Sequence, residues 1–161
     1  MHRFLACLTV GVLLSTAACE HTGTGNDSAA TGVLNGSFSA TIDGTAWTAT
    51  GKVIASEPSG TTLILDASSP TYVMKLTMAP IAGFGAAAFS LEAVPTNGSS
   101  AQLTLANGKW STANTGGTGN VSLSTLSSSR ATGTFTFDAP PSAGSGSTAT
   151  THVSGKFDVT F

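Results

Sequence analysis

Cysteine is nearly absent from this sequence of 161 residues. The two cysteines, Cys7 and Cys19, both lie within the first twenty residues, so no intramolecular disulfide can link any two later positions. The chain after Cys19 must therefore be stabilised by a hydrophobic core and by backbone hydrogen bonds. Its composition allows such a core, because 40% of all residues are apolar.

Charged residues are also scarce. They make up only 9% of the sequence, and the formal net charge is −2. Proteins that bind nucleic acid contact the phosphates through clustered lysines and arginines, whereas this chain has six such residues spread along its whole length. We therefore expect no nucleic-acid partner.

Residues that carry enzyme chemistry are few. After position 21 the only histidine is His152, and the chain has no G-x-S-x-G motif. A Ser-His-Asp triad would have to combine His152 and a serine with Asp43, Asp66, Asp138 or Asp158. His152 follows a Gly- and Ser-rich segment, which favours a solvated histidine at a strand end over a general base. We expect that the protein is not an enzyme.

Motifs for metals and cofactors are missing as well. A zinc site needs three or four His, Cys or carboxylate ligands, for which one histidine is too few, and no D-x-D-x-D-G calcium loop occurs. A carboxylate pair for glycoside hydrolysis stays open, because Glu57, Glu92 and the aspartates could converge. The simpler interpretation places these acids in turns and at solvated strand positions. We expect neither a metal nor a cofactor.

The first eighteen residues have the pattern of a secretory signal peptide. A short basic segment precedes an apolar run from Phe4 to Leu14, and small residues follow. The apolar run is too short to span a bilayer as a helix. Cys19 directly follows Ala17-Ala18, as in a bacterial lipobox, although Thr16 stands where Leu, Val or Ile is usual. We expect lipidation at Cys19, with an ordinary secretion signal as the alternative.

Residues 19–35 predict a lipidated cysteine and a flexible tether. Residues 21–35 have no hydrophobic period and are rich in Gly, Thr, Ser and Asn. A random coil of that length spans about 20 Å. Glu20 differs from the aspartate that marks inner-membrane retention in some bacteria, which favours the outer membrane. The expected organisation is a signal peptide at 1–18, the tether at 19–35 and a β-domain at 36–161.

Residues 36–50, GSFSATIDGTAWTAT, predict a β-hairpin with Asp43-Gly44 at its tip. Before the tip, apolar residues alternate with Ser and Thr, which is the period of a half-buried strand. Asp-Gly favours a two-residue type I′ turn, whose two central residues have positive φ. Such a turn pairs Ala40 with Trp47 and places the indole on the apolar face.

Further short strands follow along the chain. We predict that the first hairpin continues through 52–54 and that a turn lies at 57–60. Strands follow at 61–67, 72–78, 88–94, 120–126, 130–138 and 152–161, with a hairpin at 101–113, a turn at 95–98 and a mobile loop at 139–148. Segment 101–113 is a second hairpin with Asn107-Gly108 at its tip, in which Leu105 would face Trp110.

This pattern predicts an all-β fold. The eight to ten expected strands, with no helix after the signal, favour a hairpin-rich antiparallel sandwich or small barrel. A closed up-and-down barrel is the alternative. The last strand ends in Phe161 and resembles the C-terminal signal of outer-membrane barrels, but many strands are shorter than the 9–11 residues that such barrels need. A strand of a soluble domain is the better interpretation.

Two of these segments carry a resemblance to known proteins. The motif from Phe38 to Trp47, FSATIDGTAW, and the closing Gly155-Lys156-Phe157 follow a lipobox and a Gly/Thr-rich tether. Together they resemble a family of small lipoproteins of unknown function from diderm bacteria, whose members share F-x-A-x-(I/V)-(D/N)-G-x-x-W and end in a G-x-F strand. The resemblance covers residues 36–161 and implies an all-β lipoprotein domain. It implies no catalytic residues.

The expected function is a structural or interaction role for a lipid-anchored β-domain in the bacterial cell envelope. The expected partners are the membrane, through the lipid, and a glycan or an envelope protein. The alternative is a module that binds carbohydrate or another small ligand, in which Trp47, Tyr72 and Trp110 stack on sugar rings from one exposed face. The competing interpretation places both tryptophans in the core, because an indole is a large apolar group. A small barrel could also enclose one apolar ligand.

Overall fold

The structure is a computed structural model that describes residues 36–50, 53–59, 61–93 and 98–161. The predicted signal peptide, Cys19 and the tether lie outside the described residues, as do residues 51–52 and most of the predicted turn at 95–98. Regular structure in the described residues consists of eleven strands: β1 (Gly36–Ile42), β2 (Thr45–Thr48), β3 (Val53–Ser59), β4 (Thr62–Ser68), β5 (Val73–Met78), β6 (Ala87–Ser90), β7 (Ser100–Leu105), β8 (Gly108–Ser111), β9 (Thr118–Leu126), β10 (Arg130–Ala139) and β11 (Thr151–Thr160).

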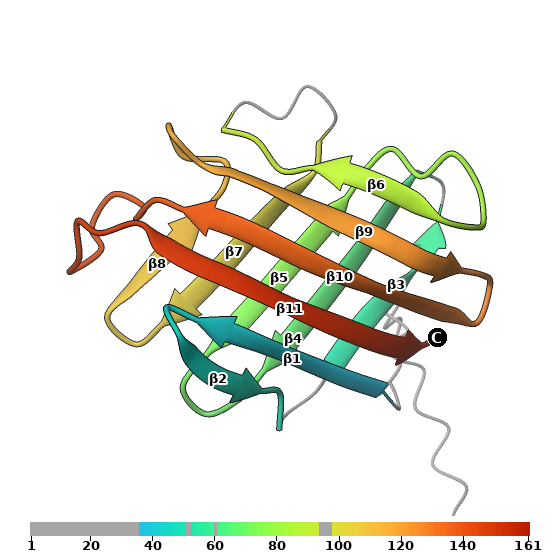
Figure 1. Ribbon diagram of the computed structural model, residues 1–161, viewed down its shortest axis with the longest axis horizontal. Helices are drawn as coiled ribbons and strands as arrows, with labels where there is room; N and C mark the ends of the chain where they lie inside the picture. Colours follow the sequence, from blue (N-terminus) through green and yellow to red (C-terminus); the bar gives the residue numbers. More distant parts are fainter. Residues whose placement is uncertain (1–35, 51–52, 60, 94–97) are drawn as a thin grey trace, which may run out of the picture. The chain divides into compact units, whose positions relative to one another are not determined.

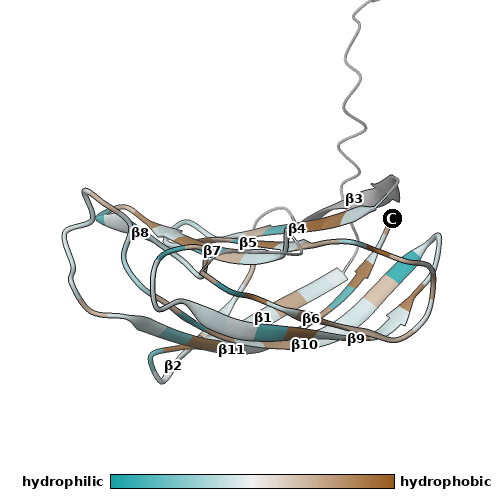
Figure 2. Cartoon of the chain, turned by 90° about the horizontal axis from the view of Figure 1, so that it is seen from above, coloured by the Kyte–Doolittle hydropathy of each residue, from teal (hydrophilic) through white to brown (hydrophobic). Residues whose placement is uncertain are grey.

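The strands form two antiparallel sheets (Figure 1). One sheet has six strands in the order β2-β1-β11-β10-β9-β6, and the other has five in the order β3-β4-β5-β7-β8. Figure 2 shows the two sheets as separate layers that face each other. The predicted all-β sandwich is therefore confirmed. The alternative of a closed barrel is wrong, because among the described strands the two sheets stay separate and each ends in two edge strands, β2 and β6 in one sheet and β3 and β8 in the other.

The core lies between the two sheets. Buried and more exposed residues alternate along the long strands, as expected when one face of each strand is packed and the other is solvated. The fully buried large side chains come from both layers and form one cluster; they include Phe38, Leu63, Leu65, Met74, Leu76, Leu103, Val121, Phe137 and Val153.

Two phenylalanines of this core each lie opposite a glycine. In the β10–β11 pair, Gly133 is the partner of Phe157, and Phe135 is the partner of Gly155. A Cβ at Gly133 would be 2.8 Å from the Phe157 ring, and a Cβ at Gly155 would be 2.5 Å from the Phe135 ring. The missing side chains let both rings lie across the neighbouring strand, where their centroids are 6.4 Å apart.

The first hairpin has the predicted register. Asp43 and Gly44 both have positive φ, 46° and 82°, as a type I′ turn requires. Ala40 pairs with Trp47, so the indole lies on the apolar face of the sheet. The predicted continuation of this hairpin through 52–54 is wrong, because β2 ends at Thr48 and β3 belongs to the other sheet.

The register of the second hairpin differs from the prediction by two residues. Leu105 pairs with Gly108 and Leu103 pairs with Trp110, so the two turn residues are Ala106 and Asn107. Neither has positive φ, so this is not the Asn-Gly type I′ turn that the dipeptide favours. Contacts with the segment after β10, described below, hold this turn in place. A shift of two residues preserves the face of each side chain, and Trp110 still points into the core.

Two other predicted boundaries are wrong. The predicted turn at 57–60 begins inside β3, which continues to Ser59 with an irregular register between Ser56 and Ser59. β3 is an edge strand, where a proline such as Pro58 and a local irregularity are tolerated. The strand predicted at 88–94 is shorter, because β6 ends at Ser90.

Candidate functional site

Trp47 and Tyr72, two of the three aromatic residues considered for ligand binding, lie together. Their ring centroids are 6.1 Å apart, and Trp47 also packs edge-on against Phe38 at 5.9 Å. Trp47 is only 8% exposed, and its indole Nε1 donates a hydrogen bond of 2.9 Å to Ser69 Oγ. The indole is therefore occupied by contacts within the protein, and Tyr72 is half-buried beside it.

Trp110, the third of these residues, lies elsewhere in the core. It is 5% exposed, and its Nε1 donates a hydrogen bond of 3.1 Å to the backbone carbonyl of Ala149. Within the described part of the chain it makes no ring contact with Trp47 or Tyr72. The interpretation of both tryptophans as core residues is confirmed, and the three residues do not form one exposed platform.

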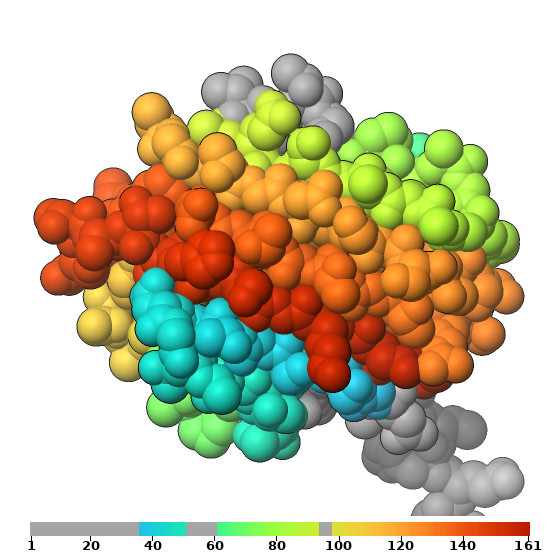
Figure 3. All heavy atoms as spheres, viewed as in Figure 1, coloured from blue at the N-terminus to red at the C-terminus, as the bar shows by residue number. Residues whose placement is uncertain are grey.

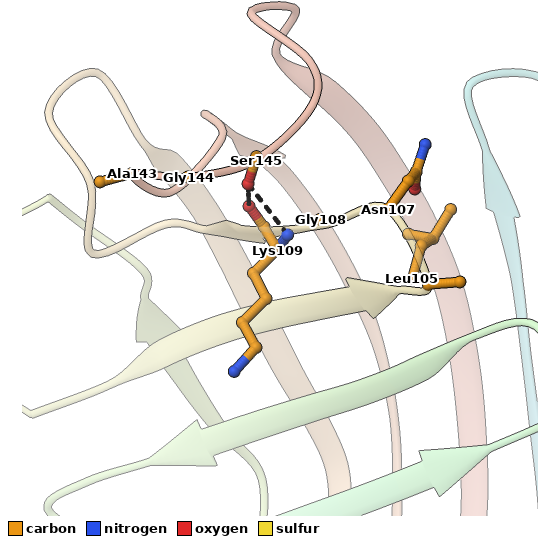
Figure 4. A pocket seen from close by; sticks show the side chains of 8 residues that line it. Leu105, Asn107, Gly108, Lys109, Ala143, Gly144 and Ser145 are labelled. Atoms are coloured by element: carbon orange, nitrogen blue, oxygen red, sulfur yellow. Dashed lines mark hydrogen bonds between the residues drawn. The ribbon is translucent and has the colours of Figure 1, made fainter.

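The segment predicted as a mobile loop at 139–148 is hydrogen-bonded along the outer edge of β8. Ser142 N donates to Lys109 O at 2.7 Å, and Gly146 N donates to Asn107 O at 3.1 Å. The Ser145 hydroxyl accepts from Lys109 N and donates to Lys109 O, as the dashed lines in Figure 4 mark. These bonds occupy edge groups of β8 that would otherwise be open to another strand.

An open depression of about 450 Å³ lies between this segment and the β7–β8 turn (Figure 4). Backbone and small side chains form most of its lining, which includes Ala106, Asn107 and Gly144. The one charged group is Lys109, whose side chain extends away from Ser145. The depression offers few side-chain groups that could orient a ligand.

The outer surface of the six-stranded sheet is rich in hydroxyl groups. Its cross-strand rows include Thr48, Ser39, Lys156, Thr134 and Ser122 in one row and Thr41, Ser154, Thr136 and Asn120 in the next. We call these nine residues the hydroxyl face. Figure 3 views the molecule from this side, and no described segment crosses the bands formed by β1, β11, β10 and β9. In the sequence, these residues appear as Ser and Thr that alternate with apolar residues along each strand. Only the order of the strands in the sheet shows that they form one surface.

A second open depression, of about 470 Å³, lies over one part of the hydroxyl face. Its lining includes Ser39, Thr41, Thr134, Ser154 and Lys156 and also Trp47, whose buried indole lies in the core. The hydroxyl groups can donate and accept hydrogen bonds, and the ammonium group can only donate. The depression brings together more Ser and Thr side chains than the depression beside Lys109 does.

His152 lies between two aspartates at one end of the hydroxyl face. Its Nδ1 is 2.7 Å from Asp138 Oδ1, and its backbone N donates to Asp43 Oδ1 at 2.7 Å. Both members of the His152–Asp138 pair are about half exposed. No serine hydroxyl is hydrogen-bonded to His152 among the described residues, so the third member of a triad is not in place. Asp43 joins the first hairpin to β11 instead.

Arg130 and Asp158 form an ion pair on the described surface with two hydrogen bonds. Arg130 Nε and Nη2 donate to the two carboxylate oxygens at 2.9 and 2.6 Å. The hydrogen bond from Arg130 lowers the pKa of Asp158 below its ordinary value of 3.8, and the same bond raises the pKa of Arg130. Both groups are exposed to solvent, so the pair is a surface feature.

In the parts of the chain that the structure describes, no three His, Cys, Asp or Glu residues are placed to hold a metal ion. The same residues form no helix that is long and apolar enough to cross a membrane.

Comparison with known proteins identifies a family. No curated protein and no solved structure matches the chain. One family model, described as a domain of unknown function (DUF6252), matches residues 35–159. This match spans the sandwich from the start of β1 into β11, which is most of the chain. The protein therefore belongs to the DUF6252 family, whose function is not established.

Proposed function

We propose that this protein is a lipoprotein of the bacterial cell envelope, held at the outer membrane by lipid on Cys19, with a structural or interaction role and no catalytic activity. The observation that carries the anchor is the placement of Cys19 directly after an apolar run and Ala17-Ala18. An acylated cysteine anchors a protein stably because each buried CH₂ group contributes about 0.8 kcal/mol.

The sandwich supports an interaction role through its surface. Most of its large aromatic side chains fill the core, whereas the hydroxyl face is broad and open to solvent (Figure 3). Hydroxyl groups on a sheet can hydrogen-bond to a glycan or to another protein without a deep pocket. This is the surface that we assign to an envelope partner.

Radiolabelled palmitate tests the anchor. The wild-type chain and a Cys7→Ser variant should both incorporate the label and fractionate with membranes. The Cys19→Ser variant should lose the label and appear in the soluble fraction. Cys7→Ser is the matched control, because it removes the chain's other cysteine and leaves the lipobox intact. Membrane retention of Cys19→Ser equal to that of the wild type would refute the anchor.

Binding of a carbohydrate is the second candidate function. It is favoured by the depression over the hydroxyl face, where several hydroxyl groups and the Lys156 ammonium lie together. Sedimentation with purified peptidoglycan tests it, with Thr134→Val as the variant and Thr125→Val, also exposed but outside the depression, as the control. Loss of sedimentation only for Thr134→Val would support this function, and no sedimentation of the wild-type protein would exclude peptidoglycan as the ligand.

A further inference from the structure

The connection from β5 to β6 exposes an apolar loop. Residues 76–91 contain no charged side chain, and at the centre of this stretch Phe84 is 67% exposed. Only one other large hydrophobic residue, Val73, is classed as exposed in the described part of the chain, and it lies on a strand. A single exposed phenylalanine is common on protein surfaces, whereas a contiguous apolar patch around it marks an interaction site.

The surface around Phe84 is apolar as well. An open hollow of about 430 Å³ lies beside it, and its lining, from Pro80 to Phe89 with Leu126, contains no polar side chain. The loop is fixed to both sheets by its backbone, because Ile81 N donates to Thr61 O at 2.7 Å and Gly85 N donates to Leu126 O at 2.9 Å. The phenylalanine is therefore presented by a braced loop.

This loop lies at the end of the sandwich where the folded chain begins. Gly36 pairs with Val159, and Arg130 pairs with Thr160. Gly85 N donates a hydrogen bond to Leu126 O, in the last residue of β9. These positions therefore lie at the same end of the sandwich. Figure 1 shows the start of β1, the start of β6 and the C-terminus on the same side of the molecule. The turns at the opposite end include Asp43-Gly44 and the Ser- and Gly-rich segment after β10.

We infer that the loop around Phe84 contacts the lipid bilayer to which Cys19 is anchored. This inference rests on the proposed lipid anchor. Sixteen residues separate Cys19 from Gly36, and a coil of that length spans about 20 Å, so the end that carries Gly36 stays nearest to the membrane. An uncharged loop with an aromatic tip suits the boundary between headgroups and acyl chains. The contact would orient the sandwich and direct Asp43-Gly44 away from the bilayer.

Fluorescence quenching in reconstituted vesicles tests the contact. The wild-type lipoprotein has no free cysteine once Cys19 is acylated and the signal is removed, so Phe84→Cys provides a single site for an environment-sensitive dye. Ala143→Cys, exposed at the opposite end of the sandwich, is the matched control. Circular dichroism checks that both variants fold.

Lipids with a quencher in the acyl chain should reduce the fluorescence at position 84 at least twofold more than at position 143. Equal quenching at the two positions would overturn the contact. A parallel sample replaces Cys19 by a histidine tag that binds nickel-chelating lipids, and the same difference is expected there. Failure of the natural anchor appears as loss of the lipoprotein from the vesicles, whereas failure of the contact appears as equal quenching in the tagged sample.

Discussion

Trp47 in the six-stranded sheet is bonded to Ser69, which follows β4 of the five-stranded sheet. The indole Nε1 donates to Ser69 Oγ at 2.9 Å, and close by, Thr50 N donates to Ser68 O at 3.1 Å. These bonds join the two sheets at the side where β2 forms the edge. The same Ser69 hydroxyl accepts a hydrogen bond from the backbone N of Tyr72. One serine therefore holds both the β4–β5 turn and the indole in place.

Two replacements of Trp47 should therefore destabilise the sandwich by different amounts. Trp47→Ala should lower the free energy of unfolding by about 3–5 kcal/mol, because it leaves a cavity beside Phe38 and Tyr72. Trp47→Phe keeps a buried ring but removes the donor, and should cost about 1–2 kcal/mol. Urea unfolding followed by circular dichroism measures both. A Trp47→Ala protein as stable as the wild type would show that the indole is not part of the core.

The glycines opposite Phe135 and Phe157 should not tolerate a side chain. Gly155→Ala places a Cβ against the Phe135 ring and the Ser39 carbonyl, which should cost about 1–3 kcal/mol of stability. Gly83→Ala is the control, since no heavy atom lies within 4 Å of the added Cβ and its φ is ordinary. The control should change stability by less than about 0.5 kcal/mol. Equal midpoints in thermal unfolding for the two variants would contradict this packing.

Ser145→Ala should expose the edge of β8. The variant removes the hydroxyl that bonds to both the N and the O of Lys109, so the Lys109 amide should exchange with deuterium faster. The expected loss of stability is about 1 kcal/mol. Ser128→Ala, in an exposed turn, is the control and should leave this amide unchanged. Unchanged exchange at Lys109 in Ser145→Ala would mean that the segment does not cover this edge.

The Asp158 carboxyl should titrate below its ordinary value of 3.8, because Arg130 donates two hydrogen bonds to it. The depressed pKa means that the pair contributes to stability above pH 3.8 and loses this contribution as the pH falls through the pKa of the folded state. Arg130→Gln should return the pKa to the ordinary value, as NMR titration of the side-chain carboxyl would measure. The same pKa in both proteins would rule out this cause.

Local signals in the sequence predicted the first hairpin and the alternation of the long strands. Asp43-Gly44 predicted the first turn correctly, because few dipeptides accept positive φ at both positions. The strand pattern also predicted a sandwich or a barrel, but it could not choose between them. That choice depends on pairings between distant segments, such as β1 with β11.

The wrong predictions have physical causes outside the local sequence. Asn107-Gly108 favours a type I′ turn, but the turn that forms has Ala106 and Asn107 at its centre. Residues 142–146 hydrogen-bond to Asn107 and Lys109 on either side of Gly108. The Gly- and Ser-rich composition of that segment predicted mobility, because composition does not reveal that an edge strand lies beside it. Of the three candidate aromatic residues, Trp47 and Tyr72 are brought together and Trp110 is not. The two tryptophans lie in the core because of the register of their hairpins. The sequence predicted this register correctly for Trp47 and incorrectly for Trp110.

Mass spectrometry of the N-terminal peptide tests the lipid anchor most directly. The protein is extracted from membranes, digested, and its first peptide is sequenced. The account predicts that this peptide begins at Cys19 and carries a diacylglyceryl group on the cysteine. A peptide that begins at another residue, or an unmodified Cys19, would contradict the account.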